Sequence, residues 1–331
     1  MAKRKYIRYA TEEKLAKVSD NNKNQIKRYF NFKNMNLSDA SKKSYQSDFN
    51  QWLVFIQEKY EQGSLMHEDI IEILSEKDGI EDMVDLLEDF VAFCVTVLGN
   101  NERRIQRRMS SISSFFLFLR KKRKIRENPL DFMERPRLSP NEKPQIVQTF
   151  LTKDQIKKIR KGLKKLDKQI ELYFEIALSS MARVNAISNI RIDQINFKEE
   201  IIERVIEKEG YEVTLYLSDK AMKLTNEWLD YRKKEKIECE YLFITKYKGE
   251  WNKVNKTTIQ TNWIKKIGAI IDIDLHSHDI RHSASSILFN DGCPLEVVQR
   301  LLNHKSPTVT QQYYIKEDMA KMRETKKSFE I

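Results

Sequence analysis

One window of the chain, residues 276–314, holds most of the side chains that could do nucleophilic and acid–base chemistry. It contains four of the chain's five histidines (His276, His278, His282 and His304), together with Arg281 and the two adjacent tyrosines Tyr313 and Tyr314. A phenol has a pKa of about 10 and is a weak nucleophile at neutral pH, so a site built on tyrosine needs cations and a base beside it. A phosphodiester meets that requirement, because a guanidinium binds its two non-bridging oxygens and an imidazole can move the proton. The window therefore predicts a phosphodiester substrate.

The motifs of this window resemble the carboxy-terminal motifs of the tyrosine recombinase (phage integrase) family. Residues 278–282, HDIRH, match the family pattern HxLRH, and residues 301–304, LLNH, match its LLGH-like element. The family's nucleophilic tyrosine follows that last histidine by nine residues, and Tyr313 stands nine residues after His304. Neighbours on a helix point about 100° apart, so Tyr314 cannot enter the same site and the spacing favours Tyr313. The resemblance implies that His278 is the base toward Tyr313, that Arg281 binds the phosphate, and that His304 donates a hydrogen bond to it.

Two motifs further upstream extend the resemblance. Residues 180–187, SMARVNAI, resemble the family's TGLRxSEL and put Arg183 at its first catalytic arginine. Met181 replaces the motif's glycine, and Ala186 replaces the acidic residue that would orient the guanidinium. We therefore expect slow cleavage, and we expect Ala186→Glu to raise the cleavage rate. Residues 205–219, VIEKEGYEVTLYLSD, resemble VxGKGxKxRxVPLSD and put Lys208 at the catalytic lysine, the acid toward the leaving 5′-oxygen. Taken alone, an arginine at 183 or a lysine in a turn would be an ordinary surface residue.

The remaining histidines and the cysteines predict no cofactor. His276 and His282 are expected as capping or core residues. Their spacing with His278, HxHxxxH, could in principle hold a metal, yet no further acidic residue or cysteine completes a plausible ligand set. The three cysteines are far apart and form no CxxC pair, which argues against a disulfide framework or a zinc site. The resemblance likewise implies that neither a metal nor a nucleotide is needed.

Composition limits the class of protein. A length of 331 residues suggests two domains, and 40% hydrophobic residues are enough for a core in each. No apolar run approaches the ~20 residues of a membrane span, and the N-terminus lacks the apolar core of a signal peptide. We therefore expect a soluble, cytoplasmic protein.

The positive charge is concentrated in one place. The net charge is +11, and residues 103–126 contain ten Lys or Arg and no Asp or Glu. A solvated basic face is the alternative, but the absence of acidic partners favours contact with a phosphate backbone. The predicted DNA-binding residues are Lys42, Lys43, Arg103, Arg104, Arg107, Arg108, Arg120, Lys121, Lys122, Arg123 and Lys124.

The first half of the chain reads as a helical bundle. Residues 1–22 are polar and basic and are expected to form an arm. Helices are predicted over residues 38–60, 64–75, 81–98 and from Asn101 onward, the last with a core stripe of Ile105, Met109, Ile112, Phe116 and Leu119. Prolines without an apolar period indicate a linker at 138–149. The domain at 23–137 resembles the family's core-binding domain, which has a SAM-like helical fold and clamps DNA.

The second domain, residues 150–331, is expected to have the family's α/β catalytic fold, so that the whole chain is mainly α with a small β-sheet. A capping box at Thr152–Gln155 should open its first helix. The predicted helices are 152–163, 169–181, 218–236, 257–267, 278–290 and a helix from Pro294 through Leu302, with a charged tail from about 316. A hairpin is predicted from strands 203–206 and 212–217, and a short strand over 241–244.

These features together predict a site-specific DNA recombinase that cuts and rejoins DNA through a 3′-phosphotyrosyl link, for integration, excision or resolution. By resemblance, double-stranded DNA is the partner, four protomers act on two DNA sites, and the tail docks on a neighbour. Two alternatives stay open at this point. One is a DNA-binding regulator that kept the fold, which the replacements at Met181 and Ala186 would favour. The other is an enzyme resembling type IB topoisomerases.

Overall fold

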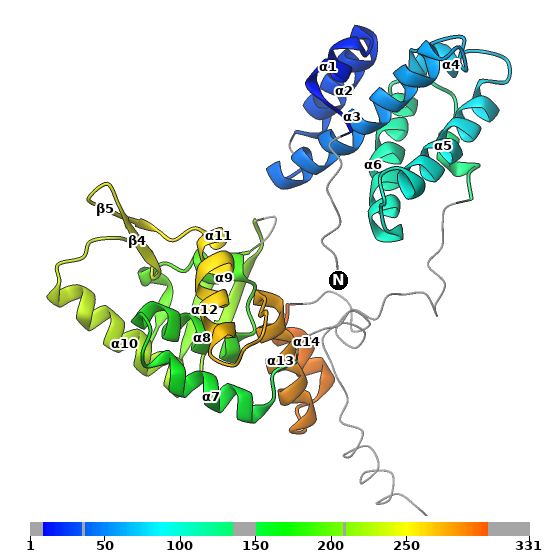
Figure 1. Ribbon diagram of the computed structural model, residues 1–331. Coiled ribbons are helices and arrows are strands. Elements are labelled where there is room, and N and C mark those ends of the chain that lie inside the picture. Colours follow the sequence, from blue (N-terminus) through cyan, green and yellow to red (C-terminus); the bar gives the residue numbers. More distant parts are fainter. Residues whose placement is uncertain (1–8, 35–36, 135–149, 208–209, 304–331) are drawn as a thin grey trace, which may run out of the picture. The chain divides into compact units, whose positions relative to one another are not determined.

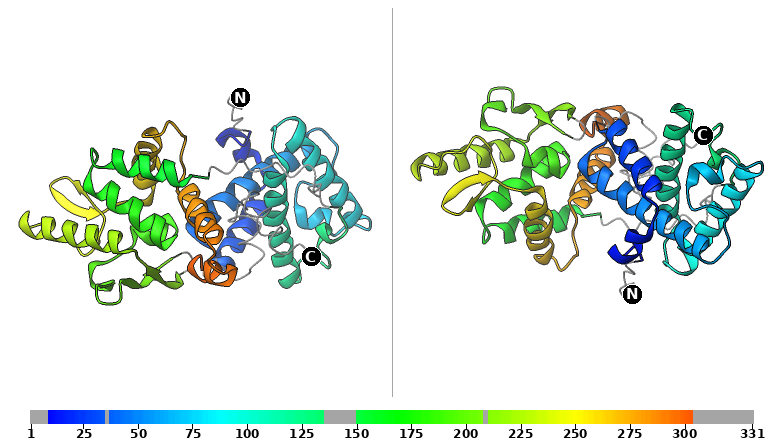
Figure 2. Two further views of the ribbon diagram at one scale, coloured as in Figure 1. Left: turned by 90° about the horizontal axis from the view of Figure 1, so that it is seen from below. Right: turned by 90° about the horizontal axis from the view of Figure 1, so that it is seen from above.

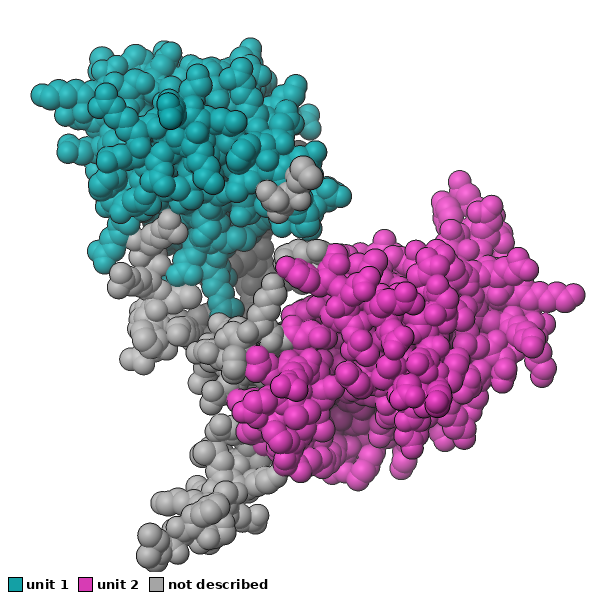
Figure 3. All heavy atoms as spheres, turned by 180° about the vertical axis from the view of Figure 1, so that it is seen from behind, with its two compact units in different colours: residues 1–144 teal, residues 145–331 magenta. Residues whose placement is uncertain are grey.

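The computed structural model describes residues 9–34, 37–134, 150–207 and 210–303. The chain forms two units, residues 1–144 and 145–331, which Figure 3 shows in separate colours. This division falls within the segment predicted as a linker. Residues 135–149 themselves lie outside the described residues, so the linker and the domain limits around it stay predictions. Of the helices in the described part of the chain, none combines the length and the apolar content that a membrane span requires.

Unit 1 is built from helices throughout its described residues (Figure 1). Polar caps set where four of them begin, since Thr11, Ser19, Ser38 and Asn101 each accept a hydrogen bond from the backbone N–H three residues later. The elements are α1 (Glu12–Lys17), α2 (Asp20–Lys33), α3 (Asp39–Glu61), α4 (Ile70–Ile73), α5 (Gly79–Thr96), α6 (Glu102–Lys121) and the 3-10 turn η1 (Pro129–Asp131). The predicted stripe of α6 is buried and joins an aromatic-rich core with residues of α2, α3 and α5. The helices predicted at 38–60, 81–98 and from Asn101 are confirmed.

The predicted N-terminal arm over residues 1–22 is wrong from residue 11 onward, because α1 and the start of α2 form there. Contacts with distant residues hold this segment. Tyr9 donates a hydrogen bond to the Glu58 carboxylate at 2.5 Å, Lys14 pairs with the same carboxylate at 2.6 Å, and Val18 is buried in the core. A short polar helix held by tertiary contacts leaves no hydrophobic period in its own sequence.

The predicted helix over residues 64–75 is also wrong, since only the single turn α4 forms. The Asn22 side chain accepts a hydrogen bond from the Ile70 N–H at 3.1 Å and donates one to the Glu68 carbonyl at 2.9 Å. A side chain of α2 therefore satisfies the backbone groups that a longer helix would have paired.

Unit 2 is mainly helical and carries two small antiparallel sheets in its described residues (Figure 1). Thr152 and Gln155 form the predicted capping box at the start of its first helix. The helices are α7 (Lys153–Leu163), α8 (Lys168–Ser180), α9 (Val184–Ser188), η2 (Ile192–Gln194), α10 (Asp219–Lys234), α11 (Lys256–Thr258), the π-helical turn η4 (Ile259–Trp263), α12 (Ile264–Ala269), α13 (Ser277–Asn290) and α14 (Leu295–Leu301). The strands are β1 (Ile195–Asn196), β2 (Ile201–Ile206), β3 (Glu212–Tyr216), β4 (Ile244–Tyr247) and β5 (Glu250–Lys253).

The first sheet has the order β1-β2-β3 and contains the predicted hairpin, in which Ile206 lies opposite Glu212. Its third strand, β1, is two residues long and has no sequence signal of its own. The strand predicted over 241–244 is misplaced: it begins only at Ile244 and pairs forward with β5, with Ile244 opposite Lys253. Leu242 and Phe243 are apolar because they belong to the core of unit 2.

The C-terminal end of α8 meets α13 and α14, and this meeting point holds the candidate site. Helix α13 lies beside α14 in every view of Figures 1 and 2. Ser283 of α13 accepts a hydrogen bond from the Leu151 N–H at 2.7 Å, and Asp291 pairs with Lys153 at 2.6 Å. Both bonds tie α13 to the start of α7. Pro294 is the N-cap of α14 and so stands one position before the predicted N1 site.

Candidate active site and DNA-binding surface

Three of the six predicted catalytic residues lie in the described part of the chain, and all three are in unit 2. Arg183 is the N-cap residue of α9, three residues after α8 ends at Ser180. His278 and Arg281 lie within the first five residues of α13. Lys208, His304 and Tyr313, together with Tyr314, lie outside the described residues. Their roles stay predictions.

The Arg281 side chain is buried and joins three helices. Its Nη1 donates to the Met181 carbonyl and its Nη2 donates to the Leu302 carbonyl, each at 2.5 Å. These carbonyls lie at the C-terminal ends of α8 and α14, where backbone acceptors lack intrahelical partners and the helix dipole is negative. Arg281 therefore neutralises two helix ends and fixes them to α13.

A small apolar cluster supports the same junction. Met181 is buried against Ala284 of α13 and against Val298 and Leu302 at α14. Since Val298 and Leu302 are fully buried, α14 cannot move away from the end of α8 without exposing them. The position of α14, and with it the point from which the chain continues toward residue 304, is therefore set by packing as well as by Arg281.

The electrostatic surroundings of His278 suit a proton acceptor. Burial lowers the pKa of His278 below its usual value, and the charges of Arg281 and Arg183 lower it further. Both guanidinium groups therefore lie close enough to act on one imidazole. A histidine with a lowered pKa is neutral at pH 7, which is the form that can take a proton.

His276 and His282 are structural, as the sequence predicts. Burial, followed by the charges of His278 and Arg281, lowers the pKa of His282 to about 4. Its ring lies 6.2 Å from that of His278 and 6.1 Å from that of Phe150, between centroids. His276 is the N-cap of α13, and its backbone N–H donates to the Asp279 carboxylate at 2.7 Å.

Arg183 has an acidic partner that the sequence reasoning missed. Its Nη1 forms an ion pair with Oε2 of Glu207, which directly follows β2. The Glu207 side chain is 7% exposed and that of Arg183 is 29% exposed, so the carboxylate lies inside and the guanidinium keeps an open side. A signal for this contact was present, because Glu207 immediately precedes the predicted catalytic lysine.

One of the predicted DNA-binding residues is not on the surface. Arg108 is fully buried in unit 1, where Nη1 donates to the Cys94 sulfur and Nη2 to Gln51 Oε1, both at 2.8 Å. Its Nε lies 3.5 Å from a carboxylate oxygen of Asp48, which is also fully buried. The prediction of a DNA contact is therefore wrong for Arg108, whose charge pairs with Asp48 inside the protein.

The other basic residues of this region form two groups at opposite ends of α6. Arg103, Arg104 and Arg107 lie near its start, and Arg107 pairs with Asp48 at 2.8 Å. The second group begins about 25 Å along the helix axis from Arg103, at 1.5 Å per residue. All of its members are exposed: Arg120, Lys121, Lys122, Arg123 and Lys124. In this group Arg120 has an acidic neighbour, Asp131, at 3.5 Å. Of the two lysines of α3 that are predicted to contact DNA, Lys43 is exposed and Lys42 bonds to Asn34 at 2.5 Å.

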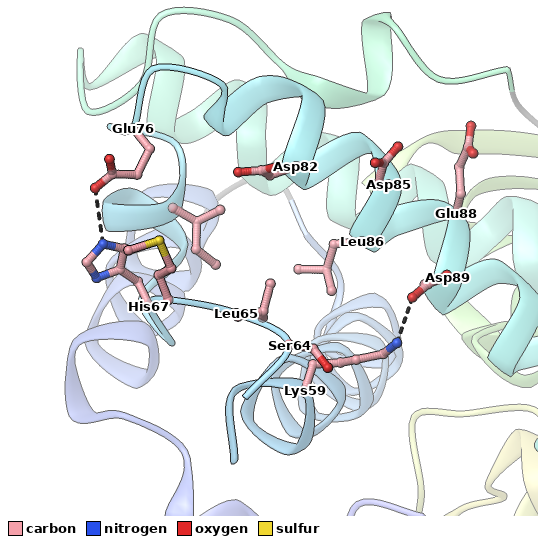
Figure 4. Close-up of a pocket in the computed structure, with 12 residues that line it drawn as sticks. Lys59, Ser64, Leu65, His67, Glu76, Asp82, Asp85, Leu86, Glu88 and Asp89 are labelled. Atoms are coloured by element: carbon pink, nitrogen blue, oxygen red, sulfur yellow. Dashed lines mark hydrogen bonds and ion pairs between the residues drawn. The ribbon is translucent and has the colours of Figure 1, made fainter. Parts of the chain in front are cut away.

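Unit 1 also has a hollow of about 630 Å³ whose charge is opposite to that of the basic groups. Five carboxylates line it around an apolar floor: Glu76, Asp82, Asp85, Glu88 and Asp89 (Figure 4). Two of them are paired, Asp89 with Lys59 at 2.6 Å and Glu76 with His67 at 3.1 Å. Carboxylates repel a phosphate backbone, so this face of unit 1 is unsuited to DNA.

Comparison with known proteins decides the family. The sequence model of the phage integrase family matches residues 149–321, more than half of the chain. The chain belongs to the phage integrase family. A tyrosine recombinase of Thermosipho africanus is 25% identical over 253 residues, which cover 75% of this chain and 83% of that protein. The tyrosine recombinase XerC of Oceanobacillus iheyensis is 25% identical over 253 residues, covering 71% of this chain and 78% of that one. As a family member the chain is a tyrosine-type DNA strand transferase, and nothing in these relatives favours an inactive regulator.

Solved structures show the same fold. The recombinase XerH in its post-cleavage complex with a palindromic difH substrate has a TM-score of 0.64 at 16% identity, over 95% of this chain and 92% of that one. Lambda integrase, as a tetramer bound to a Holliday junction, has a TM-score of 0.59 at 15% identity, over 92% of this chain and 81% of that one. The predicted tyrosine recombinase fold, mainly helical with small sheets, is confirmed.

Two glycines of the family motifs are replaced here by residues that still have a left-handed backbone. Met181, at the glycine of TGLRxSEL, has φ 52°, and Asn303, at the glycine of LLGH, has φ 51°. This conformation costs a non-glycine residue about 1–2 kcal/mol, and asparagine tolerates it better than most. Burial of the Met181 side chain offsets its cost. Both helix ends thus turn as a glycine would allow, and both present a carbonyl to Arg281.

Proposed function

We propose that this chain is a site-specific recombinase that uses Tyr313 as its nucleophile. The Tyr313 oxygen attacks the scissile phosphorus, the bond from phosphorus to the 5′-oxygen breaks, and a 3′-phosphotyrosyl ester forms. His278 takes the phenolic proton and Lys208 protonates the leaving 5′-oxygen. A 5′-hydroxyl from a second strand then attacks the ester and releases Tyr313. The ester conserves the energy of the broken bond, so rejoining consumes no nucleotide.

In this proposal the two arginines bind the non-bridging oxygens while negative charge builds in the transition state, and His304 donates a further hydrogen bond. Arg183 is the more open of the two, with 29% of its side chain exposed. Arg281 has an additional structural duty, since two of the five N–H donors of its guanidinium go to the ends of α8 and α14.

The observation that carries the proposal is the contact that brings the three residues to one junction. Arg281, one turn after His278 on α13, donates to the carbonyl of Met181, and Arg183 follows Met181 by two residues. In agreement with this geometry, the charges of both arginines lower the pKa of His278. Two cations suited to a phosphate and one neutral base therefore share a neighbourhood at the end of α8. A DNA-binding protein without catalysis would gain nothing from a neutral imidazole beside two arginines.

The related structures support the partners. XerH was solved on its difH substrate and lambda integrase as a tetramer on a Holliday junction. We propose double-stranded DNA as the substrate of this chain and a tetramer as its synaptic state, with the tail from about residue 316 docking on a neighbour. Unit 1 would serve as the clamp, using the exposed basic groups of α6. With DNA as the substrate, the cytoplasm is the proposed site of action.

A trapped cleavage reaction tests the function. Binding sites are selected from a random duplex pool with the full chain, and the selected duplex is then nicked at successive positions, so that the short 5′-hydroxyl fragment diffuses away after cleavage. We expect wild-type protein to accumulate a denaturation-resistant adduct. Arg183→Lys and His278→Gln should slow it by about 10²-fold or more while binding the duplex as tightly. A protein that binds its selected site and never forms the adduct is a DNA-binding protein and not a recombinase.

A further inference from the structure

The acidic partner of Arg183 comes from a position where the family motif has no acid. In TGLRxSEL the acidic residue stands three positions after the arginine, and here that position is Ala186. In VxGKGxKxRxVPLSD a glycine precedes the lysine, and here that position is Glu207. Since Glu207 pairs with Arg183 in the structure, the carboxylate has changed its place in the sequence and reaches the predicted catalytic guanidinium from another element.

We propose that Glu207 is the positioning residue of Arg183, and that their ion pair fixes the guanidinium to the end of β2, from which the chain leads to Lys208. This inference rests on the proposed function, because it assigns Glu207 a part in the same reaction. It gives the chain an oriented arginine in spite of the alanine at 186.

Burial supports a role in positioning. The Glu207 carboxylate is almost completely enclosed, whereas Arg183 stays partly open, so the pair occupies the inner side of the guanidinium and leaves the outer side for a phosphate. The second oxygen, Oε1, is buried without a hydrogen-bond partner in the part of the chain that the structure describes. A buried acceptor left unpaired opposes folding, so this carboxylate is poorly suited to a purely stabilising role.

A second contact holds the same strand end. Asn189, the C-cap of α9, donates through Nδ2 to the Ile206 carbonyl at 3.0 Å, and its Oδ1 accepts from Lys253 at 2.7 Å. Arg183 is the N-cap of α9, so both ends of this short helix are tied to the last residues of β2 and the residue after it. Arg183 and the segment leading to Lys208 cannot shift independently while both contacts persist.

The site of the lost acid is closed. Ala186 is fully buried in the core of unit 2, and a glutamate there would need room that this core does not have. We therefore no longer expect Ala186→Glu to raise the cleavage rate. The structure predicts that this change lowers folding stability, because it buries an added carboxylate in an apolar core.

The chemical consequence lies in the transition state. A guanidinium already aimed at the phosphate stabilises the developing charge without first having to reorganise, and losing one such oriented donor costs about 10²–10³ in rate. Glu207 itself touches no reacting atom, so its loss should act through Arg183 alone.

The test compares Glu207→Gln with Glu203→Gln, an exposed carboxylate on the same strand, under single-turnover conditions on the nicked duplex. We expect Glu207→Gln to slow adduct formation about 10²-fold at a temperature at which both variants are fully folded, with DNA affinity within error of Glu203→Gln. Glu207→Asp, which keeps the charge but shortens its reach, should fall between the two. In a cycle with Arg183→Lys, the Glu207→Gln effect should nearly vanish, because a residue acting through Arg183 has nothing left to orient.

Each other outcome overturns the proposal in a recognisable way. If wild type forms adduct and Glu207→Gln matches it, Glu207 has no part in the reaction and the recombinase function stands. A faster Glu207→Gln shows that the ion pair restrains Arg183. Additive effects in the cycle show a general structural role. If wild type itself forms no adduct, the proposed function fails and this inference falls with it.

Discussion

Replacing Arg108 should damage the folding of unit 1 and leave the salt dependence of DNA binding intact. Arg108→Gln removes hydrogen bonds to Cys94 and Gln51 and leaves the buried Asp48 with Arg107, whose side chain is 44% exposed. Burial already raises the pKa of Asp48 despite both arginines. Breaking a buried ion pair costs about 3–5 kcal/mol, which at about 3 °C per kcal/mol for a unit of this size lowers its melting temperature by about 10–15 °C.

Calorimetry of the full chain measures this change, and Arg103→Gln, at an exposed position of the same helix, is the control, expected within about 0.5 kcal/mol of wild type. Adding Asp48→Asn to Arg108→Gln should recover part of the loss, because no charge then stays buried without its partner. The reasoning is refuted if Arg108→Gln melts like wild type and reduces the salt slope of DNA binding by about one unit, as the loss of a phosphate contact would.

Three other predictions concern separate parts of the chain. Changing the five residues 120–124 to Gln should weaken DNA binding and flatten its plot of log affinity against log salt by about 0.9 for each lost phosphate contact, while an unchanged slope would assign this charge to solubility. The pKa of His282 is about 4 in the folded chain and about 6.5 in the unfolded chain, so between these pH values the unfolded chain binds more protons and the free energy of unfolding should drop by up to about 3 kcal/mol as pH falls. His282→Gln should remove this pH dependence when the free energy of unfolding is measured by urea titration at several pH values. An equal pH dependence in wild type and variant would contradict the prediction. Asn303→Gly should be at least as stable as wild type, and Asn303→Val should be less stable than wild type by about 1–2 kcal/mol in free energy of unfolding, because valine is strained in the left-handed conformation of this position. Equal stability of the two variants would contradict the prediction.

Sequence patterns predicted the parts of the fold that local signals control. The caps at Asn101 and Thr152 and the stripe from Ile105 to Leu119 depend on residues within a few turns of one another, so helices α6 and α7 were predictable. Helix α1 was not, because what holds it is a hydrogen bond and an ion pair to Glu58, more than forty residues later in the chain.

The site was predictable as a set of residue types and not as a set of contacts. The spacing of the motifs found Arg183, His278 and Arg281, and the structure brings the elements that carry them together at the end of α8. The partner of Arg183 and the carbonyls held by Arg281 come from elements whose approach no local pattern encodes.

The burial of Arg108, in contrast, could be predicted from its position on α6. At 100° per residue it lies only about 60° from Ile105, and therefore on the buried stripe. Its burial could have been predicted from this angle. Its acidic partner, Asp48 on α3, could not.

The identity of the covalently modified residue shows whether Tyr313 is the nucleophile. The adduct formed on the nicked duplex is digested with protease and nuclease, and mass spectrometry locates the nucleotide-bearing peptide. We expect a nucleotide 3′-phosphate on Tyr313, a normal yield with Tyr314→Phe and no adduct with Tyr313→Phe. An adduct mapped to Tyr314, or one that survives Tyr313→Phe, would contradict it.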